Sequence, residues 1–144
     1  MKNILLPVDG SESSKHAVDY TIDMISRLPN EHRPVLHLLN VQRALSQNFN
    51  MVVREEDRAK HYEEDGRKVI DPIESLLKLK NVTYTPHIII SGEPSTGIAD
   101  FAKERNCDLI IMGSRGLGNL KSVVMGSVAM KVVHEANVPV LLVK

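Results

Sequence analysis

The chain has 144 residues, of which 42% are hydrophobic and 25% are charged. This size and composition fit one globular domain with a buried core, so we expect a single domain over residues 1–144. Eighteen lysines and arginines balance eighteen aspartates and glutamates, and no apolar run approaches the roughly 20 residues of a membrane-spanning helix. We therefore expect neither nucleic acid nor a membrane as a partner. The single cysteine, Cys107, excludes an intramolecular disulfide framework and favours a cytoplasmic location.

Short apolar runs alternate along the chain with segments of helical period, and this alternation predicts βαβ units around a parallel sheet. The first run, residues 4–8, ends at Asp9. Apolar residues then recur at spacings of three and four, which predicts a helix over residues 11–28.

The second predicted strand, residues 35–41, is apolar on both faces except at His37 and Asn40. Such a strand is typical of the centre of a sheet that is covered on two sides. We interpret His37 as a hydrogen-bonded core histidine rather than a ligand.

A polar stretch over residues 42–67 follows, and its order is the least certain in the chain. After it, Asp71 as a cap and Pro72 at the first helical position predict a helix over residues 71–80. Whether this helix extends back through Tyr62, with a kink at the proline, stays open.

The third predicted strand, residues 82–90, contains Pro86, which lacks an amide hydrogen and is tolerated mainly at a sheet edge. The remaining pattern predicts, in order, a helix over residues 93–105, a strand over 108–112, a helix from Ser127 and a strand over 138–143. With right-handed crossovers and Pro86 at an edge, we expect an α/β fold of the flavodoxin or Rossmann type: a single doubly wound, five-stranded parallel sheet of order 3-2-1-4-5.

A glycine-rich segment follows the fourth predicted strand. Glycines occupy positions 113, 116 and 118, and Gly126 with Ser127 opens the next helix. Glycines let backbone amides approach an anion, and a helix amino terminus adds unpaired amides and a favourable dipole. The segment thus fits a phosphate-binding loop, with Arg115 or Lys121 to neutralise charge. The same residues fit a strand end, two turns and an ordinary helix cap equally well. The lysine of a P-loop and the third glycine of a dinucleotide fingerprint are both absent, so the glycine spacing alone does not decide between the two interpretations.

The spacing Gly113-x2-Gly116-x9-Gly126-Ser127 resembles the nucleotide-binding signature of the universal stress protein family. The resemblance extends over essentially the whole chain, including residues 4–11, the Gly92-x-Pro94 turn and residues 138–143. Members of the family that keep these glycines bind ATP, so the resemblance implies ATP, with Mg²⁺, as the cofactor.

The resemblance implies a binding site, without catalytic or metal-ligating residues, that consists of Pro7, Val8, Asp9, Val41, Met112, Gly113, Ser114, Arg115, Gly116, Gly126, Ser127 and Val128. In this scheme Asp9 contacts a ribose hydroxyl or helps to hold a metal, and its alternative role is that of a turn residue that starts a helix. The family usually has histidine where this chain has Asn40.

The function that the resemblance implies is a nucleotide-dependent regulatory or stress-response module. The alternatives are a slow Mg-dependent ATPase or phosphate-transferring enzyme, for which a convincing base is missing, and an interaction protein with a vestigial cleft. The resemblance also implies a homodimer through the apolar edge strand at residues 138–143, unless Lys144 and nearby loops cover that edge.

Overall fold

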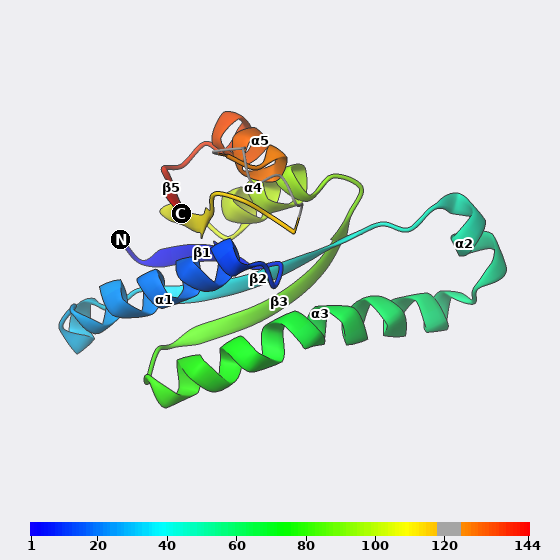
Figure 1. The fold of residues 1–144 in the computed structure, drawn as a ribbon. Coiled ribbons are helices and arrows are strands. Elements are labelled where there is room, and N and C mark those ends of the chain that lie inside the picture. Colours follow the sequence, from blue (N-terminus) through cyan, green and yellow to red (C-terminus); the bar gives the residue numbers. More distant parts are fainter. Residues whose placement is uncertain (118–124) are drawn as a thin grey trace.

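The computed structural model describes residues 1–117 and 125–144. In this part of the chain, five parallel strands form one sheet of order β3-β2-β1-β4-β5 (Figure 1). The strands are β1 (Asn3–Pro7), β2 (Val35–Arg43), β3 (Tyr84–Ser91), β4 (Leu109–Gly113) and β5 (Val140–Val143). The predicted α/β class and strand order are confirmed, and Pro86 lies on the edge strand β3 as expected.

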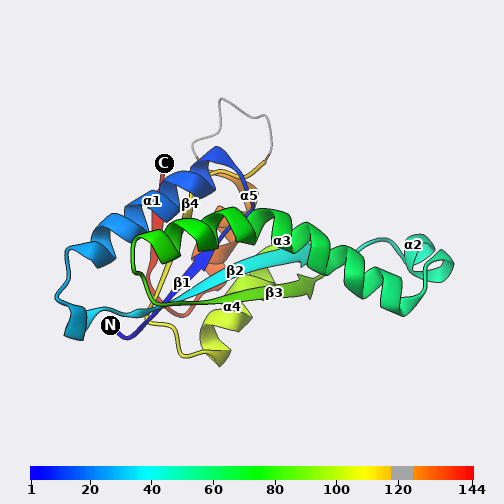
Figure 2. The same ribbon diagram turned by 90° about the horizontal axis from the view of Figure 1, so that it is seen from below.

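Helices cover both faces of the sheet (Figures 1 and 2). They are α1 (Glu12–Ser26), α2 (Gln47–Val52), α3 (Glu55–Leu79), α4 (Pro94–Glu104) and α5 (Ser127–Glu135), with a short 3-10 helix, η1, at Asn30–His32. One buried cluster joins α1 and α3 to the sheet, and a second joins α4 and α5 to the opposite face. On β1, Ile4 and Leu6 belong to the first cluster and Leu5 to the second, which explains why the strand is apolar on both faces. None of the helices described is long and apolar enough to cross a membrane.

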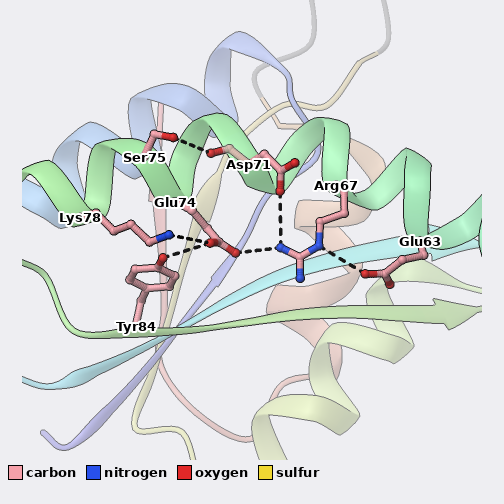
Figure 3. A network of polar contacts seen from close by, with 7 residues as sticks. All are labelled: Glu63, Arg67, Asp71, Glu74, Ser75, Lys78 and Tyr84. Carbon is pink, nitrogen blue, oxygen red and sulfur yellow. Dashed lines mark hydrogen bonds and ion pairs between the residues drawn. The ribbon is translucent and has the colours of Figure 1, made fainter.

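Helix α3 begins at Glu55, so the helix that the sequence predicted over residues 71–80 does extend back through Tyr62. It runs unbroken through Pro72, so Asp71 is an interior residue and the interpretation of Asp71 as its cap is wrong. The Arg67 guanidinium lies 3.3 Å from Glu63, 3.4 Å from Asp71 and 2.9 Å from Glu74, and these ion pairs span the proline (Figure 3). Because Pro72 is exposed, its ring disturbs no packing, and the loss of one backbone hydrogen bond is tolerated.

The polar stretch before α3 is ordered by its own contacts. Ser46 caps α2 by accepting a hydrogen bond from the Phe49 amide at 3.4 Å. The buried Tyr62 hydroxyl accepts a hydrogen bond from the Leu45 amide at 2.7 Å. Tyr62 therefore ties the chain that leaves β2 to the first part of α3.

Two histidines pair on the α4 side of the sheet. His37 Nδ1 lies 3.1 Å from His87 Nε2, so His37 is hydrogen-bonded as expected, although it is half-buried rather than part of the core. The Phe101 ring of α4 packs edge-on to both imidazoles, 6.1 Å from His37 and 4.7 Å from His87 between ring centroids. Burial lowers the pKa of both histidines, and the nearby charges of His37 and Arg105 lower the pKa of His87 further, to about 4.

Candidate functional site

A cavity of about 450 Å³ opens at the carboxyl ends of β2, β1 and β4. The strand order reverses between β1 and β4, so the cavity lies at the switch point where α/β sheets bind ligands. Every residue predicted for the site lines this cavity except Ser114. The cavity is also lined by residues that the sequence analysis did not assign to the site, namely Ser14, Leu39, Arg43, Pro94, Ile98, Leu117 and Ala129.

Backbone and side-chain hydrogen bonds fix the end of β1 at the floor of the cavity. The Val8 amide donates to the Leu39 carbonyl at 2.8 Å, and the buried Asn40 side chain donates to the Val8 carbonyl at 2.9 Å. Gln42 in turn donates to the Asn40 side-chain oxygen at 2.6 Å. Asn40 does not line the cavity, and its side chain joins β2 to the residue that follows β1.

Asp9 forms a tight turn between β1 and α1. Its Oδ1 accepts a hydrogen bond from the Ser11 amide at 2.9 Å, and Gly10 has the positive φ of 84° that such a turn requires. The second carboxylate oxygen faces the neighbouring loop, because a Cβ added at Gly116 would lie 3.3 Å from Asp9 Oδ2. Asp9 thus starts the helix with one oxygen and presents the other at the cavity.

The loop after β4 is anchored to α1 by Ser13. The Ser13 hydroxyl donates to the Val143 carbonyl at 3.2 Å and accepts from the Arg115 amide at 3.2 Å. A Cβ added at Gly113 would lie only 2.6 Å from the Ser13 carbonyl carbon. Gly113 is therefore required for the close approach of α1 to β4, a reason that is independent of any ligand.

The amino terminus of α5 forms the opposite wall of the cavity. Gly126 is the cap residue, no side chain from residues 1–117 or 125–144 caps the helix, and the Gly126 amide donates to the Ser114 carbonyl at 2.6 Å. Ser127, Val128 and Ala129, the first three residues of the helix, all line the cavity. The first amides of a helix have no partners within the helix and carry the positive end of its dipole, so this wall suits an anion.

Ser114 does not line the cavity. Its side chain is buried, and its hydroxyl has no hydrogen-bond partner among the residues that the structure describes. The resemblance predicted that Ser114 lines the phosphates, whereas in the structure its backbone groups form hydrogen bonds to two other elements. Its amide donates to the Val143 carbonyl at 2.8 Å and its carbonyl accepts from Gly126, so Ser114 joins β5 to the start of α5.

The charged residues that line the cavity are Asp9, Arg43 and Arg115. No ion pair engages any of them within residues 1–117 and 125–144, and no lining residue there is a histidine or glutamate. Within the same residues, no three histidine, cysteine, aspartate or glutamate side chains group closely enough to hold a metal. Gly118 and Lys121, which the sequence assigned to the loop, lie outside the described residues.

Two of the additional lining residues could have been found from the sequence. Arg43 follows Leu39 and Val41 at the strand period of two, so it shares their face of β2. Ser14 is a polar residue in the first turn of α1, on the side of the helix that is buried. The fact that this side faces a cavity rather than the core depends on the fold.

Comparison with known proteins places these features in one family. The profile of the universal stress protein family matches residues 1–144. The universal stress protein YxiE of Bacillus subtilis is 29% identical over 154 residues, which cover 98% of this chain and 97% of that protein. The solved structure of MJ0577, from Methanocaldococcus jannaschii, has a TM-score of 0.78 and 30% identity, and the match covers 99% of this chain and 95% of that one.

More distant structures with the same fold contain nucleotides. A universal stress protein family protein of Arabidopsis thaliana was solved with AMP bound, and it matches with a TM-score of 0.72 and 22% identity over 100% of this chain and 92% of that one. Two further universal stress proteins of this fold were solved in complex with dAMP and with cAMP. From its match over all 144 residues, the chain described here belongs to the universal stress protein family.

Proposed function

We propose that this protein binds ATP in the cavity at the carboxyl ends of β1, β2 and β4 and acts as a nucleotide-dependent regulatory module. The observation that carries the proposal is the amino terminus of α5, whose first three residues line the cavity and which no side chain caps among the described residues. Relatives of the same fold with AMP, dAMP or cAMP support an adenine nucleotide as the ligand.

The order of the strands suggests how the nucleotide lies. The β2 end of the cavity is apolar apart from Arg43, with Val41 facing Pro94 and Ile98 of α4, and it suits a base. The α5 end offers helix amides and Arg115, and it suits phosphates. The end of β1, with Asp9, lies between them and suits the sugar.

A magnesium ion would fit this arrangement only together with the phosphates. Mg²⁺ is commonly held by one or two carboxylates plus substrate phosphates and water. Asp9 supplies one carboxylate oxygen that is not used by the turn. The metal would offset phosphate charge, while Asp9 holds it from the sugar side.

The lining supports binding more than catalysis. Hydrolysis requires a positioned water and a base, and among the described lining residues only Asp9 could accept a proton. A slow ATPase is the second candidate because of this residue. In single-turnover assays with Mg-ATP, hydrolysis that disappears in Asp9→Ala while binding persists would favour the enzyme, and no hydrolysis by the native protein would favour the regulatory module.

The binding proposal is tested by calorimetry with ATP, ADP and AMP on the native protein and on Gly116→Val. Because the new side chain would project toward Asp9 Oδ2, we expect at least a tenfold loss of affinity, or about 1.4 kcal/mol. Gly92→Val is the matched control, since a Cβ at Gly92 would meet nothing within 4 Å. Unchanged affinity in Gly116→Val, or no binding by the native protein, would reject the placement.

A homodimer through β5 completes the proposal, with the cytoplasm as its location. Strand β5 has β4 on one side and no strand beyond it among the described elements, and its four side chains are only half-buried. Unpaired strand edges tend to be paired or protected. We expect Leu141→Lys to sediment as a monomer, and a variant that remained dimeric would contradict a β5 interface.

A further inference from the structure

Ser14 is a polar residue with an unused hydrogen-bond donor at the cavity. Its side chain is buried, at 3% exposure, yet it lines the cavity beside Asp9. The Ser14 oxygen accepts a hydrogen bond from the Asp9 amide at 3.3 Å. In the part of the chain that the structure describes, no acceptor bonds the proton of this hydroxyl.

Helix capping does not account for the Ser14 hydroxyl. The cap of α1 is Ser11, whose side-chain oxygen accepts from the Ser14 amide at 3.1 Å. The hydroxyl of Ser14 is a separate group, and a hydroxyl can donate one hydrogen bond while it accepts others. Its donor is therefore available to a ligand in the cavity.

Ser14 and Asp9 together form a donor and an acceptor on one turn. A carboxylate only accepts hydrogen bonds, and Asp9 Oδ2 is the oxygen that the Ser11 amide does not use. A pair of adjacent hydroxyl groups needs this combination, because each hydroxyl both donates and accepts. The β1–α1 turn thus matches a vicinal diol.

The position of the turn identifies the diol. Strand β1 lies between β2 and β4, so Ser14 and Asp9 are at the middle of the cavity, between the apolar end and the helix amides. In a nucleotide, the part between base and phosphate is the sugar. Resting on the nucleotide site proposed above, we propose that Ser14 is a specificity-determining residue: its hydroxyl donates to a ribose hydroxyl oxygen and makes the site prefer ribonucleotides to deoxyribonucleotides.

The test is calorimetry with AMP, 2′-deoxy-AMP and 3′-deoxy-AMP on the native protein and on Ser14→Ala. We expect the native protein to bind AMP about five- to tenfold more tightly than at least one deoxy analogue, the ratio that one neutral hydrogen bond supplies. In Ser14→Ala this ratio of affinities should fall to about one, because the variant lacks the hydroxyl that donates to the ribose hydroxyl oxygen.

The comparison of ratios separates recognition from structure. Ser14→Ala also leaves the Asp9 amide without its acceptor, and this effect should weaken all three nucleotides equally. Ser14→Cys, with similar volume and a weaker donor, should behave like Ser14→Ala if the donor matters. Ser75→Ala is the matched control. The Ser75 hydroxyl of α3 is exposed and donates to the Asp71 carbonyl, and neither residue lines the cavity.

The outcomes are distinct. If no nucleotide binds the native protein, the proposed function itself fails. If AMP and both deoxy analogues bind the native protein equally, or if Ser14→Ala keeps the native ratio, nucleotide binding stands and the role of Ser14 is overturned. A reduced ratio in both Ser14 variants, with the native ratio in Ser75→Ala, is the result that we expect.

Discussion

Replacement of Gly113 by alanine should destabilise the fold even without a ligand. The new Cβ would lie 2.6 Å from the Ser13 carbonyl carbon, 2.7 Å from its Oγ and 2.8 Å from its carbonyl oxygen. Two of these three atoms belong to the backbone of α1, so a side-chain rotation cannot relieve the overlap. The helix must move away from β4, which stretches two hydrogen bonds of 3.2 Å, the one that the Ser13 hydroxyl donates to the Val143 carbonyl and the one that it accepts from the Arg115 amide.

The size of the effect follows from these contacts. Overpacking of a core site typically costs about 1–3 kcal/mol, and each weakened hydrogen bond adds about 0.5–1 kcal/mol, so Gly113→Ala should cost about 3 kcal/mol. An unfolding entropy of about 2.1 cal/mol/K per residue gives roughly 0.3 kcal/mol/K for this chain, hence a fall in Tm of ~10 °C.

Thermal unfolding by circular dichroism, without nucleotide, measures this change. The control is Gly92→Ala, whose Cβ would meet nothing within 4 Å and which should change Tm by no more than about 2 °C. Equal Tm values for Gly113→Ala and Gly92→Ala would refute the view that Gly113 serves the packing of α1.

Two further predictions concern the sheet. Because the pKa of His87 in the folded protein lies at about 4, below its ordinary value of 6.5, the stability that the neutral His37–His87 pair provides should be complete above pH 6.5 and be lost as the pH falls toward 4. Urea titrations of His87→Gln should show a flatter profile in this window, while the exposed His134→Gln should keep the native profile. Gly66→Ala places a Cβ 2.7 Å from the Ile88 side chain, so its cost should exceed the helix gain of about 1 kcal/mol from alanine. The cost should disappear in the Ile88→Ala background, and unfolding data that give additive effects would contradict this contact.

The strand order could be predicted because each piece of evidence was local. A proline within a strand, such as Pro86, indicates an edge strand, and a strand that is apolar on both faces indicates the centre of the sheet. The start of α3 could not be predicted by the same means. The rule that proline favours the first position of a helix considers only the local sequence. Helix α3 extends to the N-terminal side of Pro72 because Tyr62, Gly66 and Ile70, at spacings of four, are buried. The burial of this helix face against the sheet stabilises the helix more than the proline disfavours it.

The candidate site was predicted only in part for a similar reason. The glycine pattern identified the loop and the helix start, and nearly all of the predicted residues line the cavity. The pattern did not distinguish Gly113, which is needed for packing against Ser13, from Gly116, which leaves space beside Asp9. The sequence shows that Ser14 lies on the buried side of α1, but it does not show that this side faces a cavity, which residues of three strands and three helices line together.

The serines at the start of α1 explain why the site, the helix and the last strand depend on one another. Ser11 caps the helix, and Ser13 bonds both the Arg115 amide of the site loop and the Val143 carbonyl of β5. Ser114 adds a second bond from the same loop to Val143. A ligand that pulled on Arg115 would therefore act on hydrogen bonds that also hold the end of β5, the strand at the open edge of the sheet. Any coupling between the cavity and a partner at that edge has a short physical route through Ser13.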